Sequence, residues 1–122
     1  MVRLVAGLLF LLVSTTATAV DVVNVKLMTL ELAVDIAQAA VEACREDGYQ
    51  VSVVVVDRSG RDQVVMRDVY ANQYMTQLAK AKTSAVVLSN TSSTLLGKNR
   101  ADIAAELNQL DDLLVLDGGV PI

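Results

Sequence analysis

The side chains that could carry chemistry in this chain are few. There is no histidine and only one cysteine, Cys44. Because histidine is the commonest metal ligand and general base, classical zinc sites and Ser-His-Asp catalysis are excluded. Three aspartates gather near the C-terminus (Asp111, Asp112 and Asp117), but adjacent carboxylates without an apolar pocket are usually solvated. The sequence also shows no nucleophile with a partnered base, so the residue types give no support to covalent catalysis.

Length and composition indicate one globular domain. The chain has 122 residues, of which 53% are hydrophobic and 20% charged, and these values exclude a disordered chain. A single cysteine cannot form an internal disulfide. The net charge of −4 argues against a nucleic-acid partner, which would need a basic surface.

The first nineteen residues have the pattern of a secretory signal peptide. Arg3 precedes the apolar run 4–13, and Ala17-Thr18-Ala19 matches an A-x-A cleavage site. The alternative is a retained membrane anchor, but the apolar run is far shorter than the roughly 20 residues that span a bilayer. We therefore predict a leader at 1–19, a domain at 20–122 and a secreted or periplasmic protein without a membrane segment after cleavage.

The remaining sequence predicts strands separated by helices that do not alternate strictly. Residues 20–28 alternate apolar and polar side chains as in a strand, and an apolar stripe from Leu30 to Cys44 predicts a helix capped by Thr29. The other predicted elements are strands at 50–57, 63–67 and 113–116, and helices at 73–88 and 102–107. Four consecutive valines in the second strand indicate burial on both faces. The predicted fold is therefore α+β, a three-layer α/β/α sandwich around an antiparallel sheet.

Several short motifs occur in an order that resembles a known family. They are Gly48-Tyr49, Asp57-x-x-Gly60, Met66-Arg67-Asp68, Lys80-Ala81-Lys82-Thr83 and Gly118-Gly119-Val120-Pro121-Ile122. In this order they resemble the GlcG/HbpS-like haem-binding family. The resemblance implies a profilin-like fold, a homo-oligomer and a haem or related tetrapyrrole ligand. Exported members are associated with haem sensing or breakdown.

The sequence departs from the family pattern at three places, one of which is the absence of the Gly-rich stretch that precedes the family histidine. Many members carry a histidine after the hairpin, where this chain reads Asn72-Gln73-Tyr74-Met75, although aligning on the lysine motif shifts that register. Members also continue past the Pro-Ile segment with further strands and a helix. We therefore expect a C-terminally short domain with an exposed sheet edge, which is either a fragment or a form whose edge another chain covers.

The resemblance and the residue types together suggest a haem site. Protein ligands of haem iron are His, Cys, Met and Tyr, so Tyr74 is the first candidate for the iron and Met75 the next, with Tyr70 also available. Lys80 is a candidate to bind a haem propionate or a carboxylate of a partner. Arg67 is expected to order the loop after the hairpin. Thr83 is also counted among the site residues, and its hydroxyl is expected to form a hydrogen bond with the backbone of its own helix.

Three functions remain open. The first is an exported tetrapyrrole-binding protein with little or no catalytic activity. The second is an oligomeric interaction module of the same fold that has lost its ligand, which the missing histidine favours. The third is a haem-degrading enzyme, which is the least favoured because oxygen chemistry needs a polarised distal pocket and this chain offers few donors.

Overall fold

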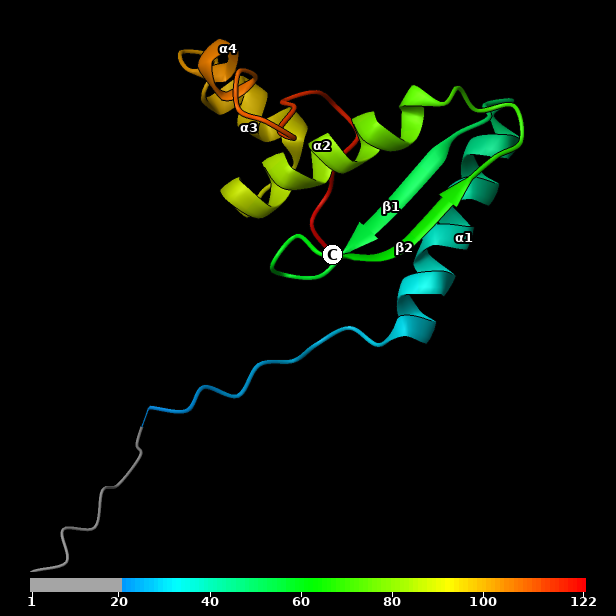
Figure 1. The fold of residues 1–122 in the computed structure, drawn as a ribbon, viewed down its shortest axis with the longest axis horizontal. Helices are drawn as coiled ribbons and strands as arrows, with labels where there is room; N and C mark the ends of the chain where they lie inside the picture. The colour runs from blue at the N-terminus through cyan, green and yellow to red at the C-terminus, as the bar shows by residue number, and fades with distance from the viewer. Residues whose placement is uncertain (1–20) are drawn as a thin grey trace, which may run out of the picture.

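The computed structural model describes residues 21–122, so the predicted leader lies outside the described residues. A long helix comes first, a hairpin follows, and three further helices precede an irregular C-terminal segment (Figure 1). The elements are α1 (Leu30–Glu46), β1 (Ser52–Val56), β2 (Asp62–Arg67), α2 (Tyr74–Ser89), α3 (Ser93–Asn99) and α4 (Ala104–Leu107). These elements confirm the predicted α+β class with an antiparallel sheet.

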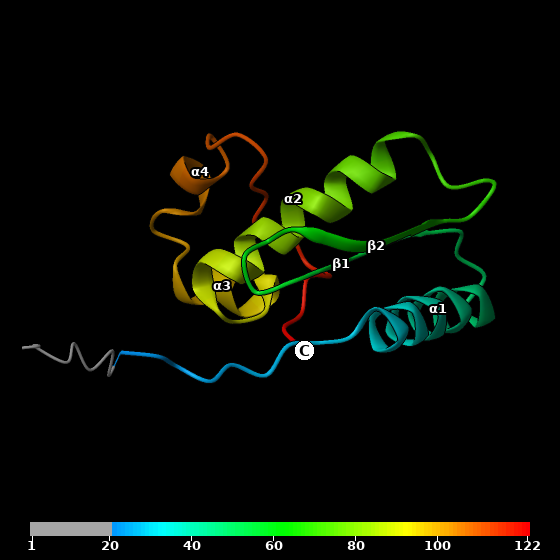
Figure 2. The ribbon, with the colours of Figure 1, turned by 60° about the horizontal axis from the view of Figure 1, so that its bottom comes forward.

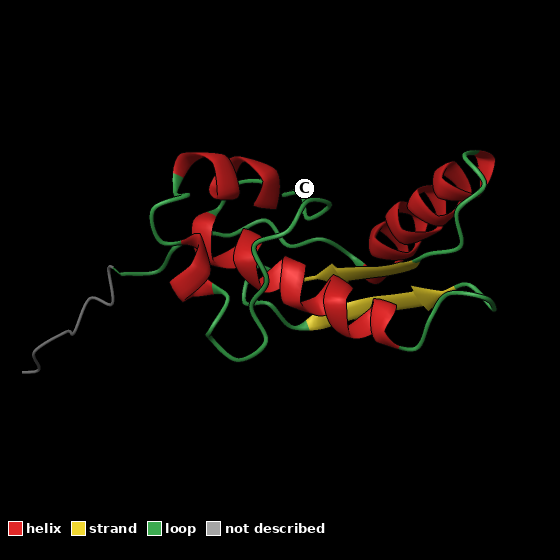
Figure 3. Cartoon of the chain, turned by 90° about the horizontal axis from the view of Figure 1, so that it is seen from above, coloured by secondary structure: helices red, strands yellow, loops and turns green. Residues whose placement is uncertain are grey.

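The hairpin is the middle layer of the domain. Figures 2 and 3 show α1 on one face of the two strands and α2 on the other. Ala33 and Ala37 of α1 pack against Val55 and Val64, and all four are buried. Alanine at these positions lets the helix backbone approach the strands closely. On the opposite face the hydroxyls of Ser52 and Thr76 are hydrogen-bonded at 2.8 Å, which joins β1 to α2.

A turn with a built-in hydrogen-bond acceptor closes the hairpin. The Oδ1 atom of Asp57 accepts the backbone N–H groups of Ser59 and Arg61 at 2.8 and 3.0 Å. Gly60 has a φ of 78°, a conformation that costs glycine least. The strand register shifts between Val55 and Val56, where β2 carries a bulge. The Asp-x-x-Gly motif therefore has a structural explanation.

Local capping signals define the ends of the helices. The Thr29 hydroxyl accepts the N–H of Leu32 at 3.3 Å at the start of α1, as predicted. Ser92 caps α3 in the same way by accepting the N–H of Leu95 at 3.2 Å. The predicted helix at 73–88 is confirmed as α2, which differs from the prediction by a single residue at each end.

Two predicted strands are wrong for the same reason. Residues 21–28 contain no strand, because no described segment pairs with them. Residues 113–116 also form no strand. The N–H of Leu114 donates to the Ala81 carbonyl of α2 at 3.0 Å, and the N–H of Val115 donates to Asn108 Oδ1 at 2.7 Å. That segment lies against α2, so its backbone N–H groups donate to isolated acceptors and not to the carbonyls of a neighbouring strand.

The Gly-Gly-x-Pro-Ile motif fastens the C-terminal segment to the helices. Gly119 is buried and exchanges hydrogen bonds with Ser93: its N–H donates to the Ser93 hydroxyl at 3.0 Å, and its carbonyl accepts the Ser93 N–H at 3.0 Å. Ser93 itself is 1% exposed. These bonds hold the C-terminal segment against the start of α3.

Candidate functional site

The five predicted site residues lie in two places. Arg67, Tyr74 and Met75 flank the loop between β2 and the start of α2, whereas Lys80 and Thr83 lie further along α2. We call residues 69–75, the connection together with the first two residues of α2, the tyrosine loop. Tyr74 and Met75 lie in it and Arg67 lies beside it at the end of β2, whereas the other two residues lie further along α2.

Arg67 holds the tyrosine loop in place. Its Nη1 atom donates to the carbonyl oxygens of Asp68 at 3.2 Å and Ala71 at 2.6 Å. The side chain of Asn72 then accepts the N–H of Tyr74 at 2.9 Å, which fixes the first turn of α2. These bonds give Arg67 the loop-ordering position that the sequence suggested.

The loop presents apolar and aromatic side chains to solvent. Val69 is 76% exposed, Tyr70 84%, Tyr74 59% and Met75 37%. Large apolar side chains clustered at one exposed site are typical of binding surfaces. The phenol of Tyr74 is thus open to a ligand and stands on a backbone that is already ordered.

Lys80 and Thr83 have partners within the chain. The ammonium group of Lys80 forms an ion pair with Asp62 of β2, and both side chains are partly exposed. The Thr83 hydroxyl donates to the Lys80 carbonyl at 2.7 Å, the local bond expected for a threonine inside a helix. A ligand carboxylate at Lys80 would have to compete with Asp62.

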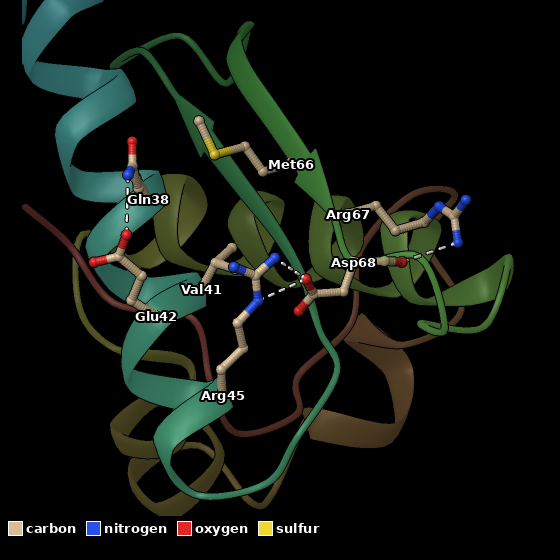
Figure 4. Close-up of a pocket in the computed structure, with 7 residues that line it drawn as sticks. All are labelled: Gln38, Val41, Glu42, Arg45, Met66, Arg67 and Asp68. Carbon is tan, nitrogen blue, oxygen red and sulfur yellow. Dashed lines mark hydrogen bonds and ion pairs between the residues drawn. The ribbon is translucent and has the colours of Figure 1, made fainter.

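A charged pair that the sequence analysis missed joins α1 to the end of β2 (Figure 4). The Asp68 carboxylate accepts from Arg45 through Nε at 2.9 Å and through Nη2, and it also accepts the N–H of Val51 at 3.2 Å. The Asp68 side chain is 2% exposed, whereas that of Arg45 is 54% exposed. The Asp68 carboxylate is thus paired with Arg45 of α1 and not with its neighbour in the sequence, Arg67.

A small pocket of about 230 Å³ opens beside this pair, between α1 and β2. Figure 4 shows Gln38, Glu42 and Arg45 facing it, while the guanidinium of Arg67 points away from these three. Ligand pockets are commonly about 300–1,000 Å³, so this one is small for a large flat molecule. A second hollow of about 350 Å³ lies among α2, α3 and α4, lined partly by Leu88, Leu96 and Ile103. Neither hollow is lined by Tyr74.

The charge on Asp68 predicts a loss of stability in acid. The Arg45 hydrogen bond holds the pKa of Asp68 below its ordinary value, against an opposing effect of burial. A carboxyl with a lowered folded-state pKa stabilises the fold above its unfolded pKa of about 3.9, and that stability is lost as the pH falls through the folded-state value. We expect the stability difference between the natural protein and Asp68→Asn to be constant above about pH 5 and to shrink below about pH 4. Urea unfolding from pH 7 to pH 3 measures it, and a difference that stays constant to pH 3 would contradict the prediction.

The tyrosine loop offers single donor atoms to a ligand. Within residues 21–122, no group of three or more Cys, Asp and Glu side chains could hold a metal ion. No helix in the same range is long and apolar enough to cross a membrane. The loop carries two exposed phenols, those of Tyr70 and Tyr74.

The fold and the loop define a small α+β domain with an antiparallel sheet covered on both faces. The chain belongs to the HbpS-like family of haem-degrading proteins, whose sequence model matches residues 28–122. It is similar to the crystal structure of HbpS, with 35% identity and a TM-score of 0.77 over 88% of this chain and 76% of that one. It is equally similar to a double mutant of Streptomyces reticuli HbpS, with 35% identity and a TM-score of 0.77 over 88% and 73%. Comparison with curated proteins found no match.

Proposed function

We propose that this protein is an exported binding protein for haem or a related tetrapyrrole, and that the tyrosine loop is its binding site. One observation carries the proposal: in a haem-family chain without histidine, an exposed tyrosine stands on an ordered loop. Export is supported by the signal-peptide pattern at 1–19. The alternative is an interaction module of the same fold that has lost its ligand.

The residues of the loop fit the requirements of haem. A tyrosine oxygen ligates haem iron in known proteins, so the Tyr74 phenol would be the residue that holds the iron. Val69 and Met75 are exposed apolar side chains that can cover part of the macrocycle. Arg67 uses Nη1 for the loop carbonyls, and its guanidinium has further N–H donors for a propionate. Bound haem would supply redox-active iron, and the chain would hold and orient it.

The exposure of Tyr74 favours binding over haem breakdown. Oxygen activation at haem depends on a distal pocket with controlled polarity and access. Tyr74 is 59% exposed, and neither described hollow is lined by it. We therefore propose that an isolated copy binds the tetrapyrrole without opening it. Formation of biliverdin or another opened product in the presence of a reductant would contradict this part of the proposal.

Titration with haemin tests the site. We expect a shifted Soret band on binding, and Tyr74→Phe should weaken binding roughly tenfold, which corresponds to about 1.4 kcal/mol. Tyr49→Phe is the matched control, because Tyr49 is also exposed (66%) but lies outside the tyrosine loop. Comparison of Arg67→Ala and Lys80→Ala tests which cation meets a propionate.

The possible results separate the two functions. Absence of a Soret shift, together with absence of competition by other tetrapyrroles, would overturn ligand binding and favour the interaction module. Equal affinities for Tyr74→Phe and the natural protein would remove Tyr74 from the site. A change in the Soret position in Tyr74→Phe but not in Tyr49→Phe would identify the phenol as the iron ligand, provided that thermal unfolding shows both variants to be folded.

A further inference from the structure

The segment before α1 has the composition of a strand but pairs with no strand among the described residues. Residues 21–27 read Asp-Val-Val-Asn-Val-Lys-Leu, and all of them are exposed. The exposed fractions of Val22, Val23 and Leu27 lie between 75% and 82%. β-branched residues in such number favour strands, and a strand needs a neighbour to satisfy its backbone groups. This segment therefore carries apolar surface that its own domain leaves uncovered.

The outer edge of β2 offers what such a segment needs. The described sheet has two strands, so the side of β2 that faces away from β1 is unpaired within residues 21–122. Val65 on β2 is 44% exposed. Close by, Gln63 Oε1 is buried and has no hydrogen-bond partner within the described part of the chain, while Gln63 Nε2 donates to the Met28 carbonyl at 3.2 Å. An added strand would cover Val65 and bring backbone N–H groups to this edge.

We propose that residues 21–27 of one copy pair antiparallel with the outer edge of β2 in a second copy. Charge complementarity selects the register. When Asp21 lies opposite Arg67, Val23 lies opposite Val65 and Lys26 lies beside Asp62. Opposite charges at both ends and an apolar pair between them are the cross-strand contacts that stabilise a sheet. The outer edge of β1 has no charged side chains to match, because β1 reads Ser-Val-Val-Val-Val.

The path of the segment indicates a second copy. Met28 packs against the core, and its carbonyl is held by Gln63. From that point residues 21–27 lead away from the helices and the hairpin (Figures 1 and 2). Pairing with its own β2 would require the chain to reverse direction just before α1. If each of two copies gives its segment 21–27 to the β2 edge of the other, both edges are paired. The two copies are then related by a two-fold axis, as in closed dimers generally.

Cysteine cross-linking tests the pairing and its register. In a Cys44→Ala background, Val23→Cys is combined with Val65→Cys, because directly opposite side chains approach closely enough for a disulfide. The control combines Val22→Cys with Val65→Cys, since the neighbouring side chain on a strand points to the other face. We expect a disulfide-linked dimer on a non-reducing gel, with a several-fold larger fraction for the first pair than for the control.

Any other result of the cross-linking experiment overturns the proposal. A disulfide within one chain, seen as a faster-migrating monomer, would place the segment on its own sheet. Equal cross-linking of both pairs, or none, would exclude the pairing. All three substituted valines are exposed, so folding should persist, and thermal unfolding verifies this. In sedimentation, in a Lys80→Gln background that removes the ion pair of Asp62 within its own chain, Lys26→Asp should weaken the dimer. The further substitution Asp62→Lys should restore it, and failure of that rescue would overturn the register.

Discussion

Gly119→Ala is expected to lower the free energy of unfolding by about 1–3 kcal/mol, the usual cost of adding a methyl group to a filled site. A β-carbon at this position would lie 2.8 Å from Val86 Cγ2, 3.0 Å from the Lys82 carbonyl oxygen and 3.2 Å from the Ser93 hydroxyl. The carbonyl belongs to the backbone of α2 and cannot move without shifting the helix. Thermal unfolding should show a melting temperature lower by roughly 4–8 °C for each kcal/mol lost.

Gly97→Ala is the matched control for that experiment. A β-carbon on Gly97 would meet only the side chain of Val115, at 3.3 Å. Gly97 also lies inside α3, where alanine is preferred to glycine by about 1 kcal/mol. We expect Gly97→Ala to be neutral or slightly stabilising. Equal destabilisation by the two substitutions would show that the close packing around Gly119 is not the cause.

Asp68→Asn is expected to destabilise the domain far more than Asp102→Asn. The Asp68 side chain is almost fully buried, and it accepts bonds from both Arg45 and the Val51 backbone. In Asp68→Asn a buried amide NH₂ group would stand where the carboxylate accepts these bonds, and the half-exposed Arg45 guanidinium would lose its counter-ion. Leaving buried polar groups without a matching partner is costly. Urea unfolding at pH 7 measures the change.

Asp102 provides a control because its pair with Arg100 has the same chemistry in solvent. Its Oδ1 atom lies 3.1 Å from Arg100 Nε, and its side chain is 63% exposed. Exposed pairs of this kind contribute little to stability, because water screens both charges. If Asp68→Asn and Asp102→Asn have equal effects, Asp68 does not hold α1 against the hairpin.

Much of the helical structure and the hairpin could be predicted from the sequence. The Thr29 cap, the apolar spacing of α1 and the Asp57–Gly60 turn depend on residues a few positions apart. The motif order also identified the family, which the match over residues 28–122 confirms. For the candidate site, the sequence indicated Arg67 as the residue that orders the tyrosine loop, and its bonds to the Asp68 and Ala71 carbonyls agree.

The contacts between distant segments could not be predicted in this way. Arg45 and Asp68 are 23 positions apart, and Lys80 and Asp62 are 18 apart, so spacing gave no sign of either pair. The strands predicted at 20–28 and 113–116 depended on distant partners in the same way, and the described residues of both segments form no strand.

Local patterns were enough to predict α1 with its Thr29 cap, α2 and the hairpin turn, because a helix or a turn satisfies its backbone hydrogen bonds within a few residues. The helix α3 was not predicted. The tertiary structure alone decided which extended segments become strands and which charges meet. A strand bonds to a neighbour that another part of the chain must supply, and an ion pair depends on where the packing of α1 and α2 on the hairpin places each side chain.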